Sequence, residues 1–570
     1  MKNSANSLHT AAWSILLLCL TWTSHLFAAD PITPDLLYDT NQLLEIEIRI
    51  STQNWNTMRM EHHDIVKYMT ADRLKNPDPD VYHYVKADIA INGQWFRSVG
   101  IRKKGFLGSS SFSRPSMKVK FNEFVKGQKI PGISRLTLNN NNQDPTQLNQ
   151  YLAYRLFREA GIPAPRCNLA HVIVNGESLG IYSHVESIRK DFLKEHYEKS
   201  NGKLYEGVAG ADFTDLQLPF FQQKNKKTAN NKTDLQKVAR ALEFEDDALL
   251  DQIEPLIDLG AFYRFWALET LTGHWDGYTD NQNNYYLYAV PTSGKFQFIP
   301  WGADSAFGAL NLFRKVKMPE SVKATAILPK RLYQITASRN QYRKVLGELL
   351  EEVWDEAELQ KEIVRMQSLI EPVLHVDRFI YDESIAKMQH YIESRRALIM
   401  EELKVPTFPS KYPEGKRTFM IKDGSVTLDF KTVWADQPEP NPFKYKPKNW
   451  QLDLEGKSFQ FIQQGVRAIP QAREVRFGQP TIQALGIVPN SSKLMILSLI
   501  IDPEFYIESK NIPVDGYAVS GWLVETFLSN PSSINIIGML NGTIQLDEAG
   551  HRQGAPVSGN VKCDIYRIRR

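Results

Sequence analysis

The sequence predicts an α+β protein that ends in an all-β domain, and three observations lead to this expectation. The chain has 570 residues, more than one hydrophobic core usually fills, so we expect at least two domains. Apolar residues recur at helical spacing between residues 148 and 157 and again over residues 340–404. Beyond a proline-rich linker at residues 405–416, strand-like runs alternate with glycine and asparagine turns, which predicts a β-sandwich over residues 417–570.

The composition is that of an ordinary globular protein, with 42% hydrophobic and 23% charged residues. The formal net charge is only +3, so we expect no nucleic-acid partner. After residue 29 no apolar run is long enough to span a bilayer, so we expect no transmembrane segment.

The N-terminus has the order of a secretory signal peptide. Lys2 precedes an apolar run from Ala11 to Trp22, and the small pair Ala28 and Ala29 follows. We therefore expect cleavage of residues 1–29 and a mature protein that is secreted, periplasmic or held at the cell surface.

Two cysteines remain after this cleavage, Cys167 and Cys563. In an oxidising compartment they could form one disulfide, and two buried thiols explain them equally well.

Two polar blocks, residues 274–286 and 299–308, stand within sequence that otherwise resembles a buried core. A kinase needs an Asp that accepts the proton of the attacking hydroxyl, an Asn that holds a metal ion, and a second Asp for the ion at the phosphates. The chain offers these parts in that order, as Asp276, then Asn281, Asn283 or Asn284, and then Asp304. A plain hairpin with a polar tip explains the same two blocks about equally well.

Upstream, a glycine- and serine-rich turn over residues 99–111 precedes a strand over residues 116–121. Alternation along this strand places Lys118 and Lys120 on one face. A flexible turn followed by a strand lysine is the nucleotide-binding half of a kinase cleft, and a solvated basic strand face is the alternative.

A helix and a hairpin should follow the lysine strand. Asp144 suits an N-cap, Pro145 the first helical position and Gln147 the third, and Gly161 ends a helix of about four turns. Two strands joined by an Asn-Gly turn come next, over residues 171–174 and 179–186.

With these motifs in this order, the chain resembles the spore coat protein H (CotH) kinase family of secreted atypical kinases. The resemblance covers roughly residues 40 to 400. The residues that carry it are Gly100–Ser111, Met117–Phe121, Leu136–Asn140, Asp144-Pro145, Leu152–Pro165, Val174–Glu186, Trp275-Asp276, Asn283–Tyr288 and Pro300–Gly308.

The resemblance implies a bilobal protein-kinase-like domain over residues 30–404, with a small lobe over about 30–186 and a large lobe over about 187–404. It implies ATP and Mg²⁺ or Mn²⁺ as cofactors and a protein hydroxyl group as the acceptor.

Residue roles follow from the same resemblance. Asp276 would be the catalytic base, Asp304 the principal metal ligand, and Asn284 or Asn283 the second metal contact. Lys118 would contact the nucleotide phosphates, with Lys120 as the rival assignment. The other residues expected to bind the nucleotide are Gly105, Gly108 and Ser109 in the glycine-rich turn and Glu186 near the hinge.

Two departures from the family pattern favour a pseudokinase as the alternative. The family turn commonly reads Pro-Trp-Asp-x-Asp, and Gly302 replaces its first Asp here. Gln150 also occupies the place where some relatives carry a Glu that pairs with the lysine.

A third hypothesis is a carbohydrate-binding surface protein. Tryptophans of the C-terminal region, Trp434, Trp450 and Trp522, could line a glycan site, although tryptophans in a β-domain are more often part of the core.

Overall fold

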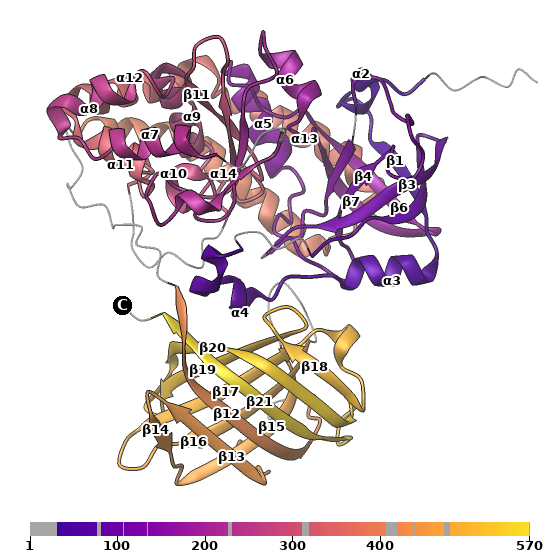
Figure 1. Ribbon diagram of the computed structural model, residues 1–570. Helices are drawn as coiled ribbons and strands as arrows, with labels where there is room; N and C mark the ends of the chain where they lie inside the picture. Colours follow the sequence, from indigo (N-terminus) through magenta and orange to yellow (C-terminus); the bar gives the residue numbers. More distant parts are fainter. Residues whose placement is uncertain are drawn as a thin grey trace, which may run out of the picture.

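The computed structural model describes residues 31–76, 81–106, 108–133, 135–225, 231–309, 319–405, 419–436, 441–471 and 479–568. Figure 1 shows an upper part of mixed helices and strands above a lower part built almost entirely of strands, which confirms the α+β class and the all-β C-terminal region. The expected signal peptide and the expected linker from residue 406 onward lie outside the described residues.

A closed barrel forms the N-terminal third of the upper part, with strand order β1-β2-β3-β4-β5-β7-β6. Neighbouring strands are antiparallel except β1 and β6, which run parallel. Its apolar side chains, such as Ile46, Ile89 and Val119, fill the interior. The strands are β1 (Leu44–Arg49), β2 (Val85–Ile91), β3 (Gln94–Lys104), β4 (Ser116–Lys120), β5 (Arg135–Asn139), β6 (Cys167–Val174) and β7 (Glu177–Val185).

The hairpin expected around Asn175-Gly176 is confirmed as β6–β7, although both strands are longer than expected. Asn175 (φ +51°) and Gly176 (φ +88°) both adopt left-handed conformations, as a two-residue hairpin turn of this kind requires.

The expected helix begins later than its cap signals suggested. It is α5 (Asn149–Glu159), not a helix from Pro145. Gln147 has a φ of +66°, which no right-handed helix accommodates, so residues 144–147 form a turn instead. From this turn the Asp144 carboxylate still accepts a 2.8 Å hydrogen bond from the Asn149 amide and so caps the helix at a distance.

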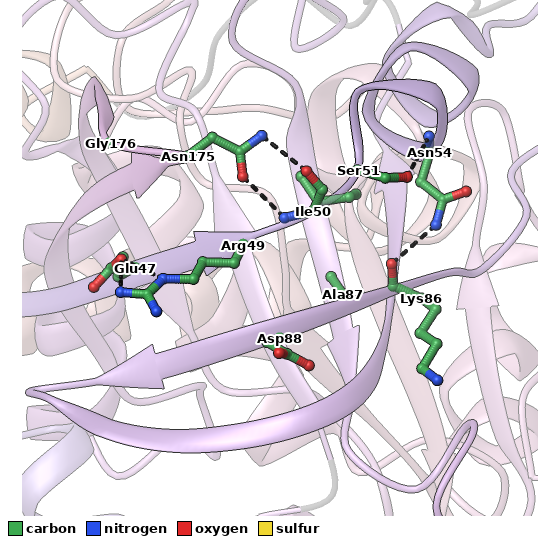
Figure 2. Close-up of a pocket in the computed structure, with 10 residues that line it drawn as sticks. All are labelled: Glu47, Arg49, Ile50, Ser51, Asn54, Lys86, Ala87, Asp88, Asn175 and Gly176. Atoms are coloured by element: carbon green, nitrogen blue, oxygen red, sulfur yellow. Dashed lines mark hydrogen bonds and ion pairs between the residues drawn. The ribbon is translucent and has the colours of Figure 1, made fainter.

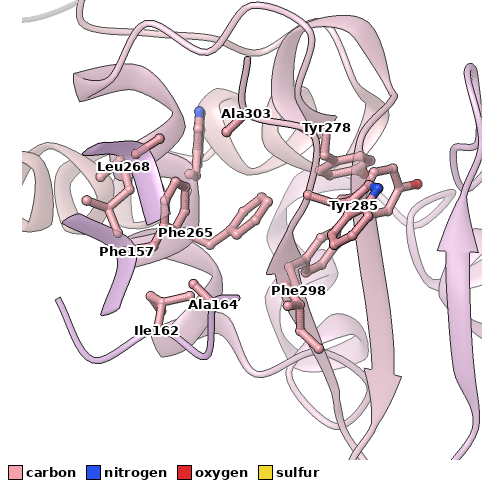
Figure 3. Close-up of a cluster of buried hydrophobic side chains, with 14 of the residues drawn as sticks. Phe157, Ile162, Ala164, Phe265, Leu268, Tyr278, Tyr285, Phe298 and Ala303 are labelled. Atoms are coloured by element: carbon pink, nitrogen blue, oxygen red, sulfur yellow. The ribbon is translucent and has the colours of Figure 1, made fainter. Parts of the chain in front are cut away.

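A helical part follows the barrel and is built around a small sheet of order β11-β10-β8-β9. Figure 3 shows how aromatic side chains pack its core, where Phe298 lies 5.3 Å from Phe265 and 4.8 Å from Tyr278 between ring centres. Residues of α5 belong to the same core cluster, so α5 packs with the helical part although the expected lobe boundary lies at residue 186.

The strands of this part are β8 (Leu204–Gly207), β9 (Phe221–Gln223), β10 (Tyr285–Ala289) and β11 (Phe296–Pro300). The longer helices are α9 (Leu259–Leu271), α12 (Thr336–Glu352), α13 (Glu356–Ile370) and α14 (Arg378–Leu403), and the shorter ones are α6 (Lys190–His196), α7 (Thr233–Ala241), α8 (Asp246–Ile253), α10 (Tyr278–Asn281) and α11 (Ile327–Gln334). Of three more helices, α2 (Pro34–Leu37) and α3 (Thr52–Met60) flank the barrel, and α4 (Ile65–Tyr68) packs against strand β20 (Asn530–Ala549) of the C-terminal region. Among the described helices, none is both long and apolar enough to cross a bilayer.

The C-terminal β-domain, residues 419–568, is one antiparallel ten-stranded sheet rather than the expected sandwich of two. The sheet curls until the Ala435 amide donates a 3.0 Å hydrogen bond to the Ala468 carbonyl, which brings the end of the first strand against β15. Long strands twist and coil, so one sheet buries its own inner face. The strands are β12 (Met420–Val433), β13 (Asn449–Leu454), β14 (Lys457–Phe459), β15 (Gln463–Gln471), β16 (Gln479–Ile487), β17 (Lys493–Ile501), β18 (Lys510–Val514), β19 (Val519–Phe527), β20 (Asn530–Ala549) and β21 (Pro556–Ile568).

Two open questions from the sequence are answered by burial. Trp434 and Trp450 are only 5% and 7% exposed and belong to the core of the β-domain, so they cannot line a glycan site. Trp522 is partly buried and packs against the cluster of Ile65, Val66 and Met539. Cys167 and Cys563 are both buried and free, so these two cysteines are thiols and do not form a disulfide.

Candidate active site

A cleft of about 1110 Å³ lies between the barrel and the helical part. Strands β3 and β4 and the glycine-rich turn line one side, and β8, β9 and the two polar blocks line the other. The expected site residues that meet in this cleft are Gly105, Ser109, Lys118, Asp276, Asn283, Asn284 and Asp304.

Three expected site residues do not line the cleft. Lys120 lies two residues beyond Lys118, a step of about 6.6 Å along the strand, and therefore falls outside the cleft. There it pairs with Glu123. Glu186 is buried in an ion pair with Arg166 at 2.6 Å. Gly108, within the glycine-rich turn, does not line the cleft, and its carbonyl accepts a 2.7 Å hydrogen bond from the side-chain amide of Asn142.

The Asp276 carboxylate is held by three asparagine side chains. Its oxygens accept hydrogen bonds from the amide nitrogens of Asn281 at 2.6 Å, Asn283 at 3.2 Å and Asn284 at 2.7 Å. The short helix α10 and the left-handed residues Gln282 and Asn284 fold the chain back so that all three amides reach one carboxylate. The orientation of Asp276 is therefore fixed before any ligand arrives.

A buried glutamate of helix α9, Glu269, binds the backbone of the loop that carries Asp276. Both carboxylate oxygens of Glu269 accept hydrogen bonds, from the amide of Tyr278 at 2.9 Å and from the amide and hydroxyl of Thr279 at 2.8 and 2.6 Å. Burial raises the pKa of Glu269 to about 7, although these bonds favour its charged form. Sequence reasoning missed Glu269 because it lies within the apolar helix α9.

Asp304 lies in the turn after β11, near two other carboxylates. Burial, then the negative charges of Asp276 and Asp144, raise the pKa of Asp304 to about 7, while the nearby ammonium group of Lys104 lowers it. Three carboxyl groups thus lie near one another, an arrangement that suits a cation bound through oxygen ligands.

Lys104 is a cleft residue that sequence reasoning missed, because it falls within the predicted turn over residues 99–111, whereas strand β3 in fact continues to Lys104. Its ammonium group donates a hydrogen bond to Asn139, whose amide donates to Gln150 of α5 at 2.7 Å. Burial lowers the pKa of Lys104 to about 8, whereas the charge of Asp304 raises it. Gln150 thus connects a cleft lysine to α5 through Asn139.

Lys118 faces Glu206 of β8, which, like Lys104, is a cleft residue that sequence reasoning missed. Burial lowers the pKa of Lys118 well below its ordinary value, and the charge of Glu206 opposes this shift. Burial also disfavours the charged form of Glu206, but Lys224 at 2.5 Å and then Lys118 outweigh it and lower its pKa to about 2. Glu206 therefore stays ionised beside two lysines.

The glycine-rich turn is held by the segment after β5. The side-chain amide of Asn140 donates to the carbonyls of Ser109 at 3.0 Å and Arg114 at 2.6 Å. Gly108 has a φ of +80°, and a Cβ there would lie 2.0 Å from the side chain of Gln143, so this position accepts only glycine.

Gly302, the departure from the family turn, also has a structural reason. Its φ is +54°, and a Cβ there would lie 2.6 Å from the Oδ1 atom of Asn284. An aspartate would require the Asn284 side chain to shift, so the two positions are coupled. Among the described residues, no group of three or more His, Cys, Asp or Glu side chains stands at metal-binding spacing.

A second hollow, of about 770 Å³, lies on the outer face of the barrel (Figure 2). Several of its polar groups bond to one another or to the backbone. Glu47 pairs with Arg49 at 2.9 Å, and the Asn175 amide bonds to both backbone groups of Ile50. We assign no chemistry to this hollow.

Comparison with known proteins agrees with the motif order. Residues 89–399 match the family described as CotH kinase protein. Invasin CotH2 of Rhizopus delemar is 24% identical over 267 residues, which are 42% of this chain and 45% of that relative. Spore coat protein homolog 1 of the same organism is 26% identical over 278 residues, 45% of each chain. Inner spore coat protein H of Bacillus subtilis is 22% identical over 303 residues, 50% of this chain and 82% of the relative.

The match to the two Rhizopus proteins thus spans less than half of their length. The family match, in contrast, covers more than half of this chain and includes Lys118, Asp276 and Asp304. This chain is a member of the CotH kinase family.

Proposed function

We propose that this protein is a kinase that transfers a phosphoryl group from ATP to a protein hydroxyl group with the help of Mg²⁺ or Mn²⁺. One observation carries the proposal: Asp276, Asp304 and two partly buried lysines, Lys104 and Lys118, face a single cleft although they come from distant parts of the sequence. The barrel and the helical part would be the small and large lobes of a bilobal kinase-like domain.

The residues present fit a divalent metal ion. Asp304 offers a carboxylate, and Asn284 offers an amide oxygen on the side that faces Gly302. Mg²⁺ is commonly held by one or two carboxylates together with water and substrate phosphates, so a large set of acidic ligands is not needed. When bound, the ion would neutralise charge that builds up on the phosphates.

The remaining roles belong to the side chains of this chain. Asp276 would accept the proton of the attacking hydroxyl, and its three asparagine partners keep it in one orientation. Lys104 and Lys118 would position the phosphates from the barrel side of the cleft. Lys104 is the stronger candidate beside the metal, because its charge acts directly on Asp304.

A non-catalytic pseudokinase scaffold is the second candidate, and Gly302 is the observation that favours it. The carboxylate that the family turn commonly supplies is missing, and an aspartate at this position would need a φ of +54° and a shift of the Asn284 side chain. Relatives named as invasins and as an inner spore coat protein indicate that members of this family serve at surfaces. We propose that this chain too is exported, as its N-terminal sequence suggests.

Incubation of the purified chain with labelled ATP, a mixture of protein acceptors and either metal tests the proposal. We expect labelled protein that depends on the metal. Calorimetry with ATP and Mg²⁺ separates the two candidates: binding without transfer under any metal supports the pseudokinase, and neither binding nor transfer contradicts both.

A further inference from the structure

The β-domain touches the glycine-rich turn that lines the cleft. Phe112, directly after this turn, is only 4% exposed and belongs to the hydrophobic core cluster of the β-domain. Its ring lies edge-on to Phe505 of the β-domain, with 4.9 Å between ring centres. A residue of the barrel region is thus packed as part of another domain.

A linking segment, residues 59–70, lies between the glycine-rich turn and the β-domain. In Figure 1 its helix α4 lies between the upper and lower parts of the molecule. On its cleft side, Phe106 of the turn packs against His63 and Tyr68, at 5.4 and 4.1 Å between ring centres. The contact continues through Arg59, whose guanidinium donates to the Phe112 carbonyl.

On its other side the linking segment is bound to the β-domain by polar contacts. The Arg59 guanidinium pairs with Glu504, and His62 bonds to Asp515 at 2.7 Å. The Ile65 amide donates to the Asp515 carbonyl at 2.9 Å, and the Asn541 amide donates to Asp64 at 3.0 Å. The junction therefore combines buried rings, charged pairs and backbone hydrogen bonds.

The β-domain also reaches the cleft itself. Phe419 and Ile568, at the start of its first strand and the end of its last, line the same cleft as Lys118 and Asp304. The family match ends at residue 399, so this contribution comes from outside the shared domain.

We propose that the β-domain completes the nucleotide site: it holds the glycine-rich turn through Phe112 and the linking segment, and it closes one rim of the cleft with Phe419 and Ile568. The part of this inference that concerns nucleotide rests on the proposed function. The part that concerns the turn does not.

Hydrogen exchange of the full-length chain, read in peptides that cover residues 105–112, tests the anchoring without any nucleotide. Glu504→Lys reverses the charge opposite Arg59 and should speed exchange of these amides about tenfold, because the turn loses its outer support. Phe505→Ala removes the ring that touches Phe112 and should act in the same way, while Phe505→Leu should restore most of the protection.

Asp547→Lys is the matched control, since Asp547 is exposed on the same domain, and it should change nothing. Circular dichroism checks that the β-domain of each variant is folded. Calorimetry with Mg²⁺ and a non-hydrolysable ATP analogue should show about threefold or greater loss of affinity in Glu504→Lys and Phe505→Ala.

Unchanged hydrogen exchange over residues 105–112 in both Glu504→Lys and Phe505→Ala would overturn the claim that the β-domain holds the turn. Faster exchange with unchanged nucleotide affinity overturns the claim that the β-domain is part of the nucleotide site. A wild-type chain that binds no nucleotide refutes the proposed function instead, and the exchange rates still decide whether the β-domain holds the turn.

Discussion

The side-chain amide of Asn149 donates a 2.7 Å hydrogen bond to the backbone carbonyl of Asp304. The first residue of α5 therefore fixes the turn that carries the candidate metal ligand. The Asn149 backbone amide also donates to Asp144, so one asparagine joins the helix cap to the turn. The position of Asp304 therefore depends on α5 as well as on strand β11, which precedes its turn.

Asn149→Ala should weaken metal-dependent nucleotide binding without removing a ligand. The lost bond is worth about 1 kcal/mol, so we expect roughly a fivefold weaker affinity for the metal–nucleotide complex. Calorimetry at several Mg²⁺ concentrations measures it. Gln53→Ala, at an exposed position of helix α3, is the control, and equal affinity in both variants would contradict the role of Asn149.

The two cleft lysines should differ when each is replaced by methionine, which keeps the length of the side chain but not its charge. Lys104→Met removes the cation that acts on Asp304, so phosphotransfer should fall about 100-fold or more. Lys118→Met leaves Glu206 paired with Lys224 and should mainly raise the KM for ATP. Lys120→Met is the control outside the cleft. If Lys120→Met is as damaging as the other two, the assignment of the lysines is wrong.

Glu269→Gln should disturb the Asp276 loop although it leaves the size of the side chain unchanged. Glutamine has one acceptor oxygen, whereas both oxygens of Glu269 accept bonds from Tyr278 and Thr279. An unsatisfied buried donor costs about 1–3 kcal/mol, so we expect lower thermal stability together with a lower kcat. A Glu269→Gln variant with wild-type kcat and melting temperature would show that the loop does not need this carboxylate.

The junction with the β-domain should weaken as pH rises. Burial lowers the pKa of His62, but its hydrogen bond and ion pair with Asp515 outweigh burial and raise the pKa above its ordinary value. A raised histidine pKa contributes stability that is present below the unfolded value of about 6.5 and is lost as pH rises through the folded value.

His62→Gln should therefore lower the melting temperature by about 2 °C at pH 6 and by less at pH 8. Scanning calorimetry of wild type and variant at both pH values measures the difference. A gap that widens with pH would contradict the pairing of His62 with Asp515.

The sequence predicted those features that local chemistry determines. The Asn175-Gly176 hairpin follows from turn conformation, and the Asp276 and Asp304 motifs are short enough to be recognised in a single stretch. Strand-like runs between glycine and asparagine turns predicted an all-β domain but not that its strands form one curled sheet, because a sandwich and a curled sheet share the same pattern.

What the sequence could not predict depends on contacts between distant residues. Lys104 belongs to the cleft because β3 lies opposite the Asp304 turn, and Glu206 belongs to it because β8 pairs with β10. Lys120 shares a strand face with Lys118, yet it lies two residues further along the strand, outside the cleft, and pairs with Glu123. The contact of Phe112 with the β-domain has no sequence signal at all.

The central claim is tested most directly by phosphotransfer and nucleotide binding measured side by side for wild type, Asp276→Asn and Asp304→Ala. Asp276→Asn removes the proton acceptor, so turnover should fall about 100-fold or more while nucleotide binding persists. Asp304→Ala removes a metal ligand, so turnover and metal-dependent binding should fall together. Wild-type phosphotransfer in both variants, or ATP binding by the wild-type chain with no transfer under any divalent metal, would contradict the account.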